Sequence, residues 1–280
     1  RDLHKEYRRQ RQMCIIDRTK LNIDTLDETS MSAAQERQNT LTKPLGSLGR
    51  LEELSIQLAG IYADPKPIIT KKSVILAAGD HGVVAEGVSA YPQEVTPQMV
   101  QNFLSGGAGI NVLARHVEAD ITILDVGVAS DLPNHPLLKN VKVAKGTQNI
   151  AIGPAMTLDQ AIKCLEIGIQ AAEDQISGGT DLIAFGEMGI GNTTPSSAIT
   201  SVITKTDAAI TTGRGTGVDD KSLEHKISII NRAIDTNKPD PSDGLDVLVK
   251  IGGLEIGALA GAMLATAAHH KPVVVDGFIS

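Results

Sequence analysis

The chain has 280 residues, enough for one large domain or two modest ones with an ample core. Hydrophobic residues make up 41% and charged residues 21%, as in ordinary globular proteins, and the net charge of −7 argues against a nucleic-acid or anionic-membrane partner. Aromatic residues amount to 2% with no Trp, which removes the stacking platforms of single-strand binders.

The first 66 residues are predicted to be a helical segment that forms part of a small domain. The cluster "DETS" supplies capping groups for a helix that starts near Ser30. After the breaks in "TKPLGSLG", leucines and an isoleucine recur at helical spacing through "RLEELSIQLAGIY", and "ADPKP" forms a linker. The N-terminus lacks the apolar region of a secretory signal, and its acids count against a transit peptide, so we expect a cytoplasmic protein.

Residues 67–280 alternate short apolar runs with helical patterns. We predict strands at 73–79, 120–128, 141–146, 180–186 and 271–279, and helices at 106–119, 157–176, 220–235 and 244–270. Near-continuous apolar strands separated by helices indicate a parallel sheet covered on both faces. The prediction is therefore an α/β fold, doubly wound and mostly parallel, with a small helical N-terminal domain. The run "IGALAGAMLATAA" (256–268) is too short to span a bilayer, and we expect a closely packed core helix there.

Glycines and ionisable groups follow the predicted strands, where ligands collect in such sheets. Asp80 and His81 follow the first strand, Asp125 lies in the second, Glu187 ends the fourth and Asp276 lies in the last. An Asp in such a place can equally cap the next helix, and this alternative carries equal weight for Asp80, Asp125 and Asp276.

The stretch "GEMGIGNTTPSSA" (186–198) combines one acid with a glycine-bearing turn that leads into a helix. Free N–H groups and the helix dipole there favour an anion, and Asn192, Thr193 and Thr194 add side-chain donors. The cluster "TTGRGTGVDD" (211–220) could approach the same anion, with Arg214 and Lys226 balancing its charge. The stretch lacks the Lys of a Walker loop and the dinucleotide fingerprint, and a plain turn with a Thr-rich cap is the alternative.

Several ordered motifs resemble one family, nicotinate-nucleotide–dimethylbenzimidazole phosphoribosyltransferase. They are "TKPLGSLGRLE" (42–52), "AAGDHGVVAEGVSAYPQEVT" (77–96), "DVGV" (125–128), "GTQNIAIGPAM" (146–156), "GEMGIGNTT" (186–194), "GRGTGVDD" (213–220) and "DGLDVLVKIGGLEIGALAGAML" (243–264). The resemblance covers roughly residues 40–280.

The resemblance implies transfer of ribose 5-phosphate from nicotinate mononucleotide to dimethylbenzimidazole or a related base, giving α-ribazole phosphate and nicotinate. It also implies a homodimer, a Rossmann-like large domain, a small helical domain and no metal or cofactor. His269 and His270, the adjacent histidine pair, lack a further ligand at metal spacing. The family places its general-base glutamate in an Arg-Leu-Gly-Glu-Gly-[ST]-Gly motif near the C-terminus, which the 280 residues do not contain. Because that motif is missing, we expect the chain to be truncated at its C-terminus, and its first residue, which is Arg and not Met, indicates that the other end is cut as well.

Carried over residue by residue, the resemblance assigns the active-site acid to Glu187 and the active-site lysine to Lys226. Taken alone, Lys226 would be a solvated helix charge. The phosphate and nucleotide would bind at Met188, Gly189, Ile190, Gly191, Asn192 and Thr193, with help from Gly215 and Gly217. The base pocket would involve Asp80, His81, Tyr91, Pro92 and Met99, although Tyr91 could equally lie in a surface turn.

Two other functions stay open at this point. The chain could be a binding-only or inactive form, because the C-terminal glutamate is missing from it. It could also be a Rossmann-type nucleotide-binding oxidoreductase, which the fold class alone would allow.

Overall fold

The structure is a computed structural model that describes residues 15–215, 217 and 219–280. Its centre is a parallel sheet of strands β1 (Lys72–Gly79), β2 (Ala119–Gly127), β3 (Leu138–Asn140), β4 (Leu182–Met188) and β5 (Val273–Val274), in the order β3-β2-β1-β4-β5. This order, in which the chain moves outward from β1 first on one side and then on the other, is that of a Rossmann-like sheet. The predicted α/β doubly wound fold is confirmed.

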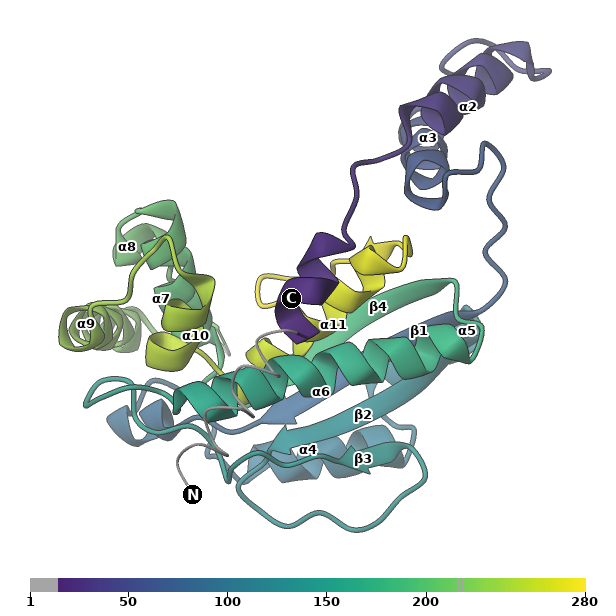
Figure 1. The fold of residues 1–280 in the computed structure, drawn as a ribbon. Helices are drawn as coiled ribbons and strands as arrows, with labels where there is room; N and C mark the ends of the chain where they lie inside the picture. The colour runs from purple at the N-terminus through teal and green to yellow at the C-terminus, as the bar shows by residue number, and fades with distance from the viewer. Residues whose placement is uncertain (1–14, 216, 218) are drawn as a thin grey trace.

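Helices cover both faces of the sheet (Figure 1). Helices α6 (Leu158–Ser177) and α11 (Leu254–Ala268) pack on one face, and α4 (Val95–Leu104) and α5 (Gly109–His116) pack on the other. A helical segment over residues 15–21 adds Ile16 to the first of these layers. Strand β1 is buried from Ser73 to Gly79, which explains why its sequence is apolar without alternation.

Helices α6 and α11 touch backbone to backbone. A Cβ added at Gly168 of α6 would lie 1.8 Å from the carbonyl oxygen of Ala258, and one at Gly261 of α11 would lie 2.0 Å from that of Leu165. Only glycine leaves room for this approach. The Gly- and Ala-rich run is thus a closely packed core helix, as predicted.

A group of helices lies at the carboxyl ends of the strands (Figure 1). It contains α7 (Thr193–Thr204), α8 (Ala208–Thr211), α9 (Asp220–Asn237) and α10 (Gly244–Ile251). These helices share a small apolar core of their own that includes Ala198, Ile230 and Ile251. These helices therefore lie next to the carboxyl ends of the strands, where a ligand is expected to bind.

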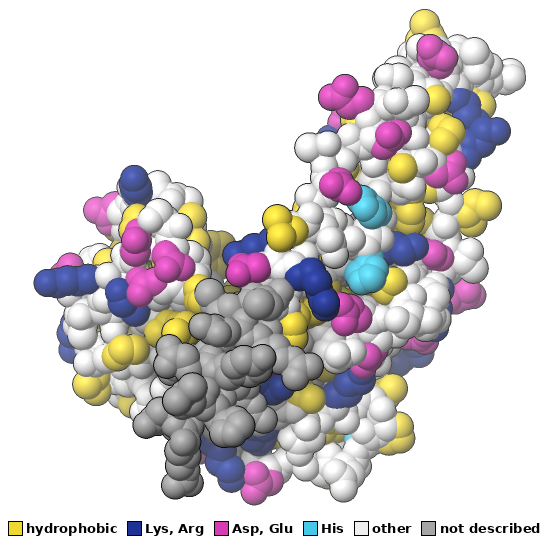
Figure 2. All heavy atoms as spheres, viewed as in Figure 1, with side chains coloured by type: hydrophobic (Ala, Val, Ile, Leu, Met, Phe, Trp, Pro, Cys, Tyr) yellow, Lys and Arg dark blue, Asp and Glu magenta, His cyan; other side chains and the backbone are white. Residues whose placement is uncertain are grey.

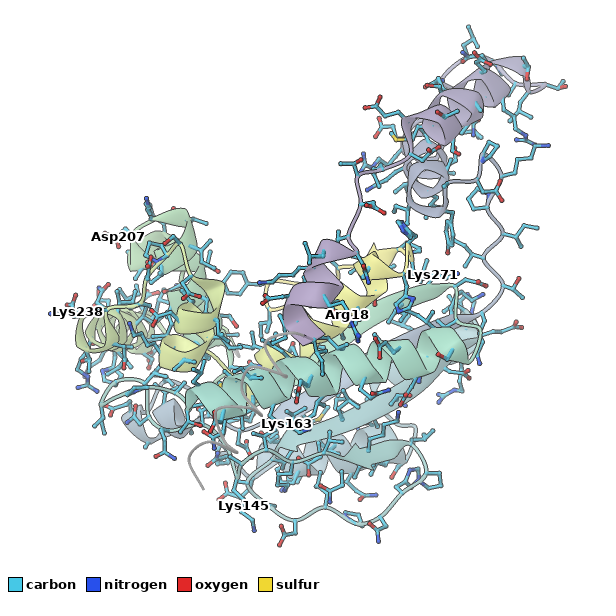
Figure 3. All side chains as sticks on the ribbon, in the orientation of Figure 1. Arg18, Lys145, Lys163, Asp207, Lys238 and Lys271 are labelled. Carbon is cyan, nitrogen blue, oxygen red and sulfur yellow. The ribbon has the colours of Figure 1, made fainter. Side chains whose placement is uncertain are left out.

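Helices α2 (Glu28–Thr40) and α3 (Arg50–Tyr62) form a hairpin that projects from the opposite end of the sheet (Figure 1). The Asp27 side chain caps α2 through the N–H of Ser30 at 2.6 Å, so the helix predicted near Ser30 is confirmed. The hydroxyl of Tyr62 donates to the carbonyl of Asp181 at 2.7 Å, and Lys271, labelled in Figure 3, lies 5.2 Å from the Tyr62 ring centre. The domain boundary at residue 66 stays a prediction.

Three predicted elements are wrong in part. Residues 141–146 form no strand, because the N–H groups of Val141 and Val143 bond to the consecutive carbonyls of Asp125 and Val126, which breaks a regular ladder. The helix predicted over 244–270 is two helices, α10 and α11, which are separated at Gly252 and Gly253. The strand predicted over 271–279 is limited to β5. The short 3-10 helix η1 (Gly82–Glu86) was not predicted from any sequence pattern.

On the face shown in Figure 2, acidic and basic side chains are interspersed rather than gathered by sign. None of the helices in the described ranges is long and apolar enough to cross a bilayer.

Candidate active site

A cavity of about 200 Å³ opens where the sheet order reverses, at the carboxyl ends of β1 and β4. Ligands of open α/β sheets bind at such switch points. The lining brings together most of the predicted catalytic and phosphate-binding residues: Glu187, Met188, Gly189, Ile190, Gly191, Asn192, Thr193 and Lys226, together with Val88 and Ser89.

Strand alternation fixes the side of the sheet on which Glu187 lies. Phe185 packs in the layer of α6 and α11, whereas Met188 packs against the layer of α4 and α5, so Glu187 shares the face of Phe185. The amide of Asn192 donates to its carboxylate. Burial, followed by the negative charge of Glu255, raises the pKa of Glu187 above its ordinary value. A carboxylate held in this way suits a site where positive charge develops.

The turn after β4 offers an anion its backbone rather than its side chains. Gly191 has φ +87°, a left-handed conformation that favours glycine, and a Cβ there would lie 2.6 Å from Val84. Among the described residues, the N–H groups of Gly191 and Thr193 have no acceptor, and they lie at the N-terminus of α7. Two of the predicted side-chain donors are engaged, since Asn192 bonds to Glu187 and the Thr193 hydroxyl accepts from Lys226, whereas the buried Thr194 hydroxyl has no partner among the described residues.

Lys226 is a buried cation and not a solvated one. Its side chain is on the inner face of α9, the residue is 2% exposed, and its Nζ donates to Thr193 Oγ1 at 2.6 Å. Burial lowers the pKa of Lys226 to about 8. Gly215 lies over this pair, since a Cβ there would be 3.1 Å from the Nζ. A cation with a hydroxyl as its hydrogen-bond partner is placed to receive an anion.

Glu86, the last residue of η1, connects η1 to helix α9. The Glu86 carboxylate accepts from Asn149 Nδ2 at 2.7 Å and pairs with Arg232 of α9. His225, the neighbour of Lys226, donates through Nε2 to the Glu86 carbonyl at 2.6 Å. The position of Lys226 therefore depends on contacts between α9 and the segment that follows β1.

Asp80 and His81 are fully buried at the end of β1. Asp80 Oδ2 accepts from the N–H of Ala129 at 2.8 Å, and its other oxygen has no hydrogen-bond partner among the described residues. His81 Nε2 lies 2.7 Å from Oε1 of Glu255, a residue of the first turn of α11 that sequence analysis did not select. A single acid inside the apolar stretch 251–268 was the indication available in the sequence, because such an acid is buried only with a partner.

The other predicted base-pocket residues lie farther from this cavity. Tyr91 is 52% exposed, Pro92 is exposed, and neither lines the cavity. Met99 belongs to α4, and it packs, as Met188 does, against the apolar cluster of the α4 and α5 layer. Gly217 has open space around its Cα and φ +96°.

Two further acids at strand ends differ in their surroundings. Asp125 accepts from the N–H of Val128 at 2.9 Å in the turn after β2 and lies 3.2 Å from Lys142 Nζ, so it does not cap the next helix. Asp276 is exposed beyond β5, and its charge contributes to raising the pKa of Glu187. Among the described residues, no cluster of His, Cys, Asp and Glu is arranged to hold a metal ion.

Three larger hollows lie outside this edge of the sheet. One of about 480 Å³ runs along α6, where Lys139 and Asp174 pair with each other at 2.6 Å. Another, about 360 Å³, lies between residues 15–21, α10 and α11 and is mainly apolar. The third, about 260 Å³, lies between α2, α3 and residues 65–67. Within the part of the chain that the structure describes, none of them combines a buried cation with free backbone donors.

A sequence model of the family described as "Phosphoribosyltransferase" matches residues 23–280. The chain is 56% identical to the nicotinate-nucleotide–dimethylbenzimidazole phosphoribosyltransferase of Chloroflexus aggregans, over 96% of this chain and 76% of that protein, and 54% identical to the enzyme of the same name from Roseiflexus sp. over the same shares. Among solved structures, CobT from Thermus thermophilus matches with a TM-score of 0.86 at 45% identity, covering 90% of this chain and 75% of that one.

Proposed function

Because the chain belongs to the nicotinate-nucleotide–dimethylbenzimidazole phosphoribosyltransferase family, we propose that the cavity at the ends of β1 and β4 is its transfer site. The chain is a pentosyltransferase, and its reaction belongs to the assembly of the cobalamin lower ligand. The relatives support this function and neither of the alternatives, the binding-only protein and the oxidoreductase. One observation carries the site proposal: a buried cation, free backbone donors and a half-buried acid line one cavity.

The phosphate of nicotinate mononucleotide is proposed to bind the turn from Gly189 to Thr193. The N–H groups of Gly191 and Thr193 lie at the positive N-terminal end of α7 and can donate to the phosphate, and Lys226 supplies a full positive charge. Phosphate binding would return the Lys226 pKa toward its ordinary value, because the anion favours the protonated ammonium. Gly215 leaves the space above this cation that a phosphate oxygen needs.

Glu187 is proposed to face the ribose. As the bond from the anomeric carbon to the nicotinate nitrogen breaks, its electron pair leaves with nicotinate and positive charge grows on the sugar. A fixed carboxylate stabilises that charge in a partly desolvated site. The side-chain amide of Asn192 is used by this carboxylate, whereas the backbone N–H groups of Gly191 and Thr193 have no acceptor within the described chain and stay free for the phosphate. This division of donors explains how an acid and an anion site share one stretch of sequence.

The incoming base is proposed to lie toward Val88, Ser89 and Met188, with Asp80 and His81 beneath it. A nitrogen of the benzimidazole attacks the anomeric carbon from the side opposite the departing nicotinate, so the β-linked substrate becomes an α-linked product. The N–H proton of the base must leave at the same stage, and a carboxylate can accept it. Tyr91, Pro92 and Met99 stay predictions for the outer part of this pocket.

The reaction itself is the test. The protein is incubated with nicotinate mononucleotide and dimethylbenzimidazole, and α-ribazole phosphate is measured by chromatography. We expect product to form in a one-to-one ratio with nicotinate. A protein that binds the nucleotide and yields neither product would contradict the proposal, and a nicotinamide dinucleotide fluorescence change would favour the oxidoreductase instead.

We also propose a cytoplasmic homodimer in which residues 1–66 belong to a small domain. Leucines 45, 48 and 51 of the α2–α3 hairpin are exposed, and apolar side chains of this kind favour a protein partner. Light scattering after size exclusion measures the mass of the particle. A monomer at micromolar concentration would contradict the proposed dimer.

A further inference from the structure

Three glycines enclose the buried pair of His81 and Glu255. A Cβ added at Gly253 would lie 2.7 Å from His81 Cε1 and 2.9 Å from both oxygens of the Glu255 carboxylate. One at Gly79 would lie 2.8 Å from Glu255 Oε2. One at Gly189 would lie 2.2 Å from the carbonyl oxygen of Gly79 and 3.2 Å from His81 Nε2. These glycines come from β1, from the anion turn and from the start of α11. Gly79 and Gly253 therefore leave the room that the pair occupies, and Gly189 allows the close approach of the Gly79 backbone and of the His81 ring.

Burying the His81–Glu255 pair also costs free energy of folding. His81 is 1% exposed and Glu255 is fully buried, and their hydrogen bond uses one atom of each. His81 Nδ1 and Glu255 Oε2 have no hydrogen-bond partner among the described residues. Buried groups that are half satisfied weaken a fold, and apolar residues of similar size would often serve stability better. A pair retained at this cost is better explained by a role in the site than by a role in folding.

The imidazole links the pair to the cradle. The His81 ring lies against Gly189, which directly follows Glu187 and Met188 and opens the phosphate turn. Glu255, in turn, holds the ring from the first turn of α11, where a carboxylate is favoured by the helix dipole. A movement of the ring would change the backbone position from which Glu187 and the free N–H groups are both presented.

We propose that Glu255 is a positioning residue for the transfer: its hydrogen bond holds the His81 ring against Gly189 and so fixes Glu187 relative to the phosphate cradle. This inference rests on the proposed function. It assigns Glu255 no contact with the substrate.

The charges around the pair agree with this role. Burial disfavours the imidazolium, but the charge and hydrogen bond of Glu255, with the charges of Asp80 and Glu187, outweigh burial and raise the pKa of His81. When the ring is protonated, the negative charge of Glu255 therefore strengthens the hydrogen bond that orients it.

The first test separates positioning from binding. Glu255→Gln keeps the shape and removes the charge, and we expect kcat to fall at least about tenfold while KM for nicotinate mononucleotide stays within about twofold, since the phosphate contacts remain. Asp174→Asn, which breaks the Lys139 pair at the far end of α6, is the matched control and should change neither constant. Equal kcat in Glu255→Gln and the unsubstituted protein would overturn the proposal.

A second variant covers the case in which Glu255→Gln does not fold. Gly253→Ala keeps every charge, its backbone is extended at φ −136°, and its methyl group would displace the pair. We expect the same loss of kcat with KM preserved. Gly109→Ala, also at a helix start and with nothing within 4 Å of its added Cβ, should behave as the unsubstituted protein. A fully active Gly253→Ala would overturn the proposal.

Histidine NMR gives a readout that does not depend on turnover. In ¹⁵N-histidine-labelled protein, assigned with His81→Gln, the His81 ring should stay protonated to a higher pH than ordinary histidine, and Glu255→Gln should lower its titration point. An identical titration in both proteins would overturn the proposal. If the unsubstituted protein forms no α-ribazole phosphate, the proposed function fails, whereas the titration still decides whether Glu255 holds the ring.

Discussion

Replacing Lys226 with Met should make the ligand-free protein more stable while removing nucleotide binding. The Met side chain keeps most of the buried lysine stem and removes an ammonium that burial penalises. The difference between the ordinary pKa of 10.5 and about 8 corresponds to about 3 kcal/mol at neutral pH. Loss of the hydrogen bond to Thr193 costs about 1 kcal/mol, so the net gain is about 2 kcal/mol, or about 4 °C in Tm.

The pH dependence provides an internal check on this reasoning. Lys226 binds its proton more weakly in the folded than in the unfolded chain, so between about pH 8 and pH 10.5 the unfolded chain holds more protons. Stability of the unsubstituted protein should therefore rise through this window relative to Lys226→Met, and the difference between the two should shrink. The residue's contribution is unfavourable below the window and is relieved above it.

Thermal melts with and without nicotinate mononucleotide, from about pH 6.5 to about pH 10, measure both effects. The nucleotide should raise the Tm of the unsubstituted protein, because it binds only the folded state, and should leave Lys226→Met unchanged. Lys221→Met, at an exposed position on the same helix, is the control and should keep the nucleotide shift. A Lys226→Met protein that melts lower and keeps the shift would refute the assignment of a buried, phosphate-facing cation.

Three more outcomes are expected. Glu187→Gln should reduce kcat by about two orders of magnitude or more with a modest change in nucleotide affinity, since it removes charge and keeps shape; unchanged turnover would make Glu187 a structural acid. Turnover of the unsubstituted protein should fall on the acid side at a pH above the ordinary 4.5 of a glutamate, because the ionised form is required and burial raises the pKa of Glu187; a pH–rate profile measures this limb, and a midpoint no higher than that of an ordinary glutamate contradicts it. Gly168→Ala should lower the free energy of unfolding by about 3 kcal/mol, because its methyl group meets the Ala258 carbonyl, whereas Gly153→Ala, with open space around it, should be neutral in urea denaturation.

The sheet and its ligand edge were predictable because their signals are local. Apolar strands such as β1 and β4 stand out in any window, and the glycines after them mark the edge where the cavity lies. The anion turn was predictable for the same reason, although the engagement of Asn192 and Thr193 with Glu187 and Lys226 was not. Backbone direction could be inferred from sequence, and hydrogen-bond partners could not.

The remaining differences all depend on contacts distant in sequence. Lys226 looks like a surface charge in its own helix, and only the packing of α9 over the turn buries it. The role of Glu255 depends on its hydrogen bond with His81, which lies 174 positions away in the sequence. The break between α10 and α11 falls at Gly252 and Gly253, and a Cβ added at Gly253 would meet the ring of the distant His81, which the periodicity within 244–270 does not reveal.

The backbone contact between α6 and α11 also indicates which residues could be changed to alter the base that accepts the ribose phosphate. Side chains larger than hydrogen at Gly168 and Gly261 would separate the two helices, so the layer behind Glu187 offers little freedom for redesign. Val88 and Ser89 form a wall of the cavity between η1 and α4, outside that contact. Mutant libraries aimed at other azoles should therefore diversify this wall and leave the paired helices untouched.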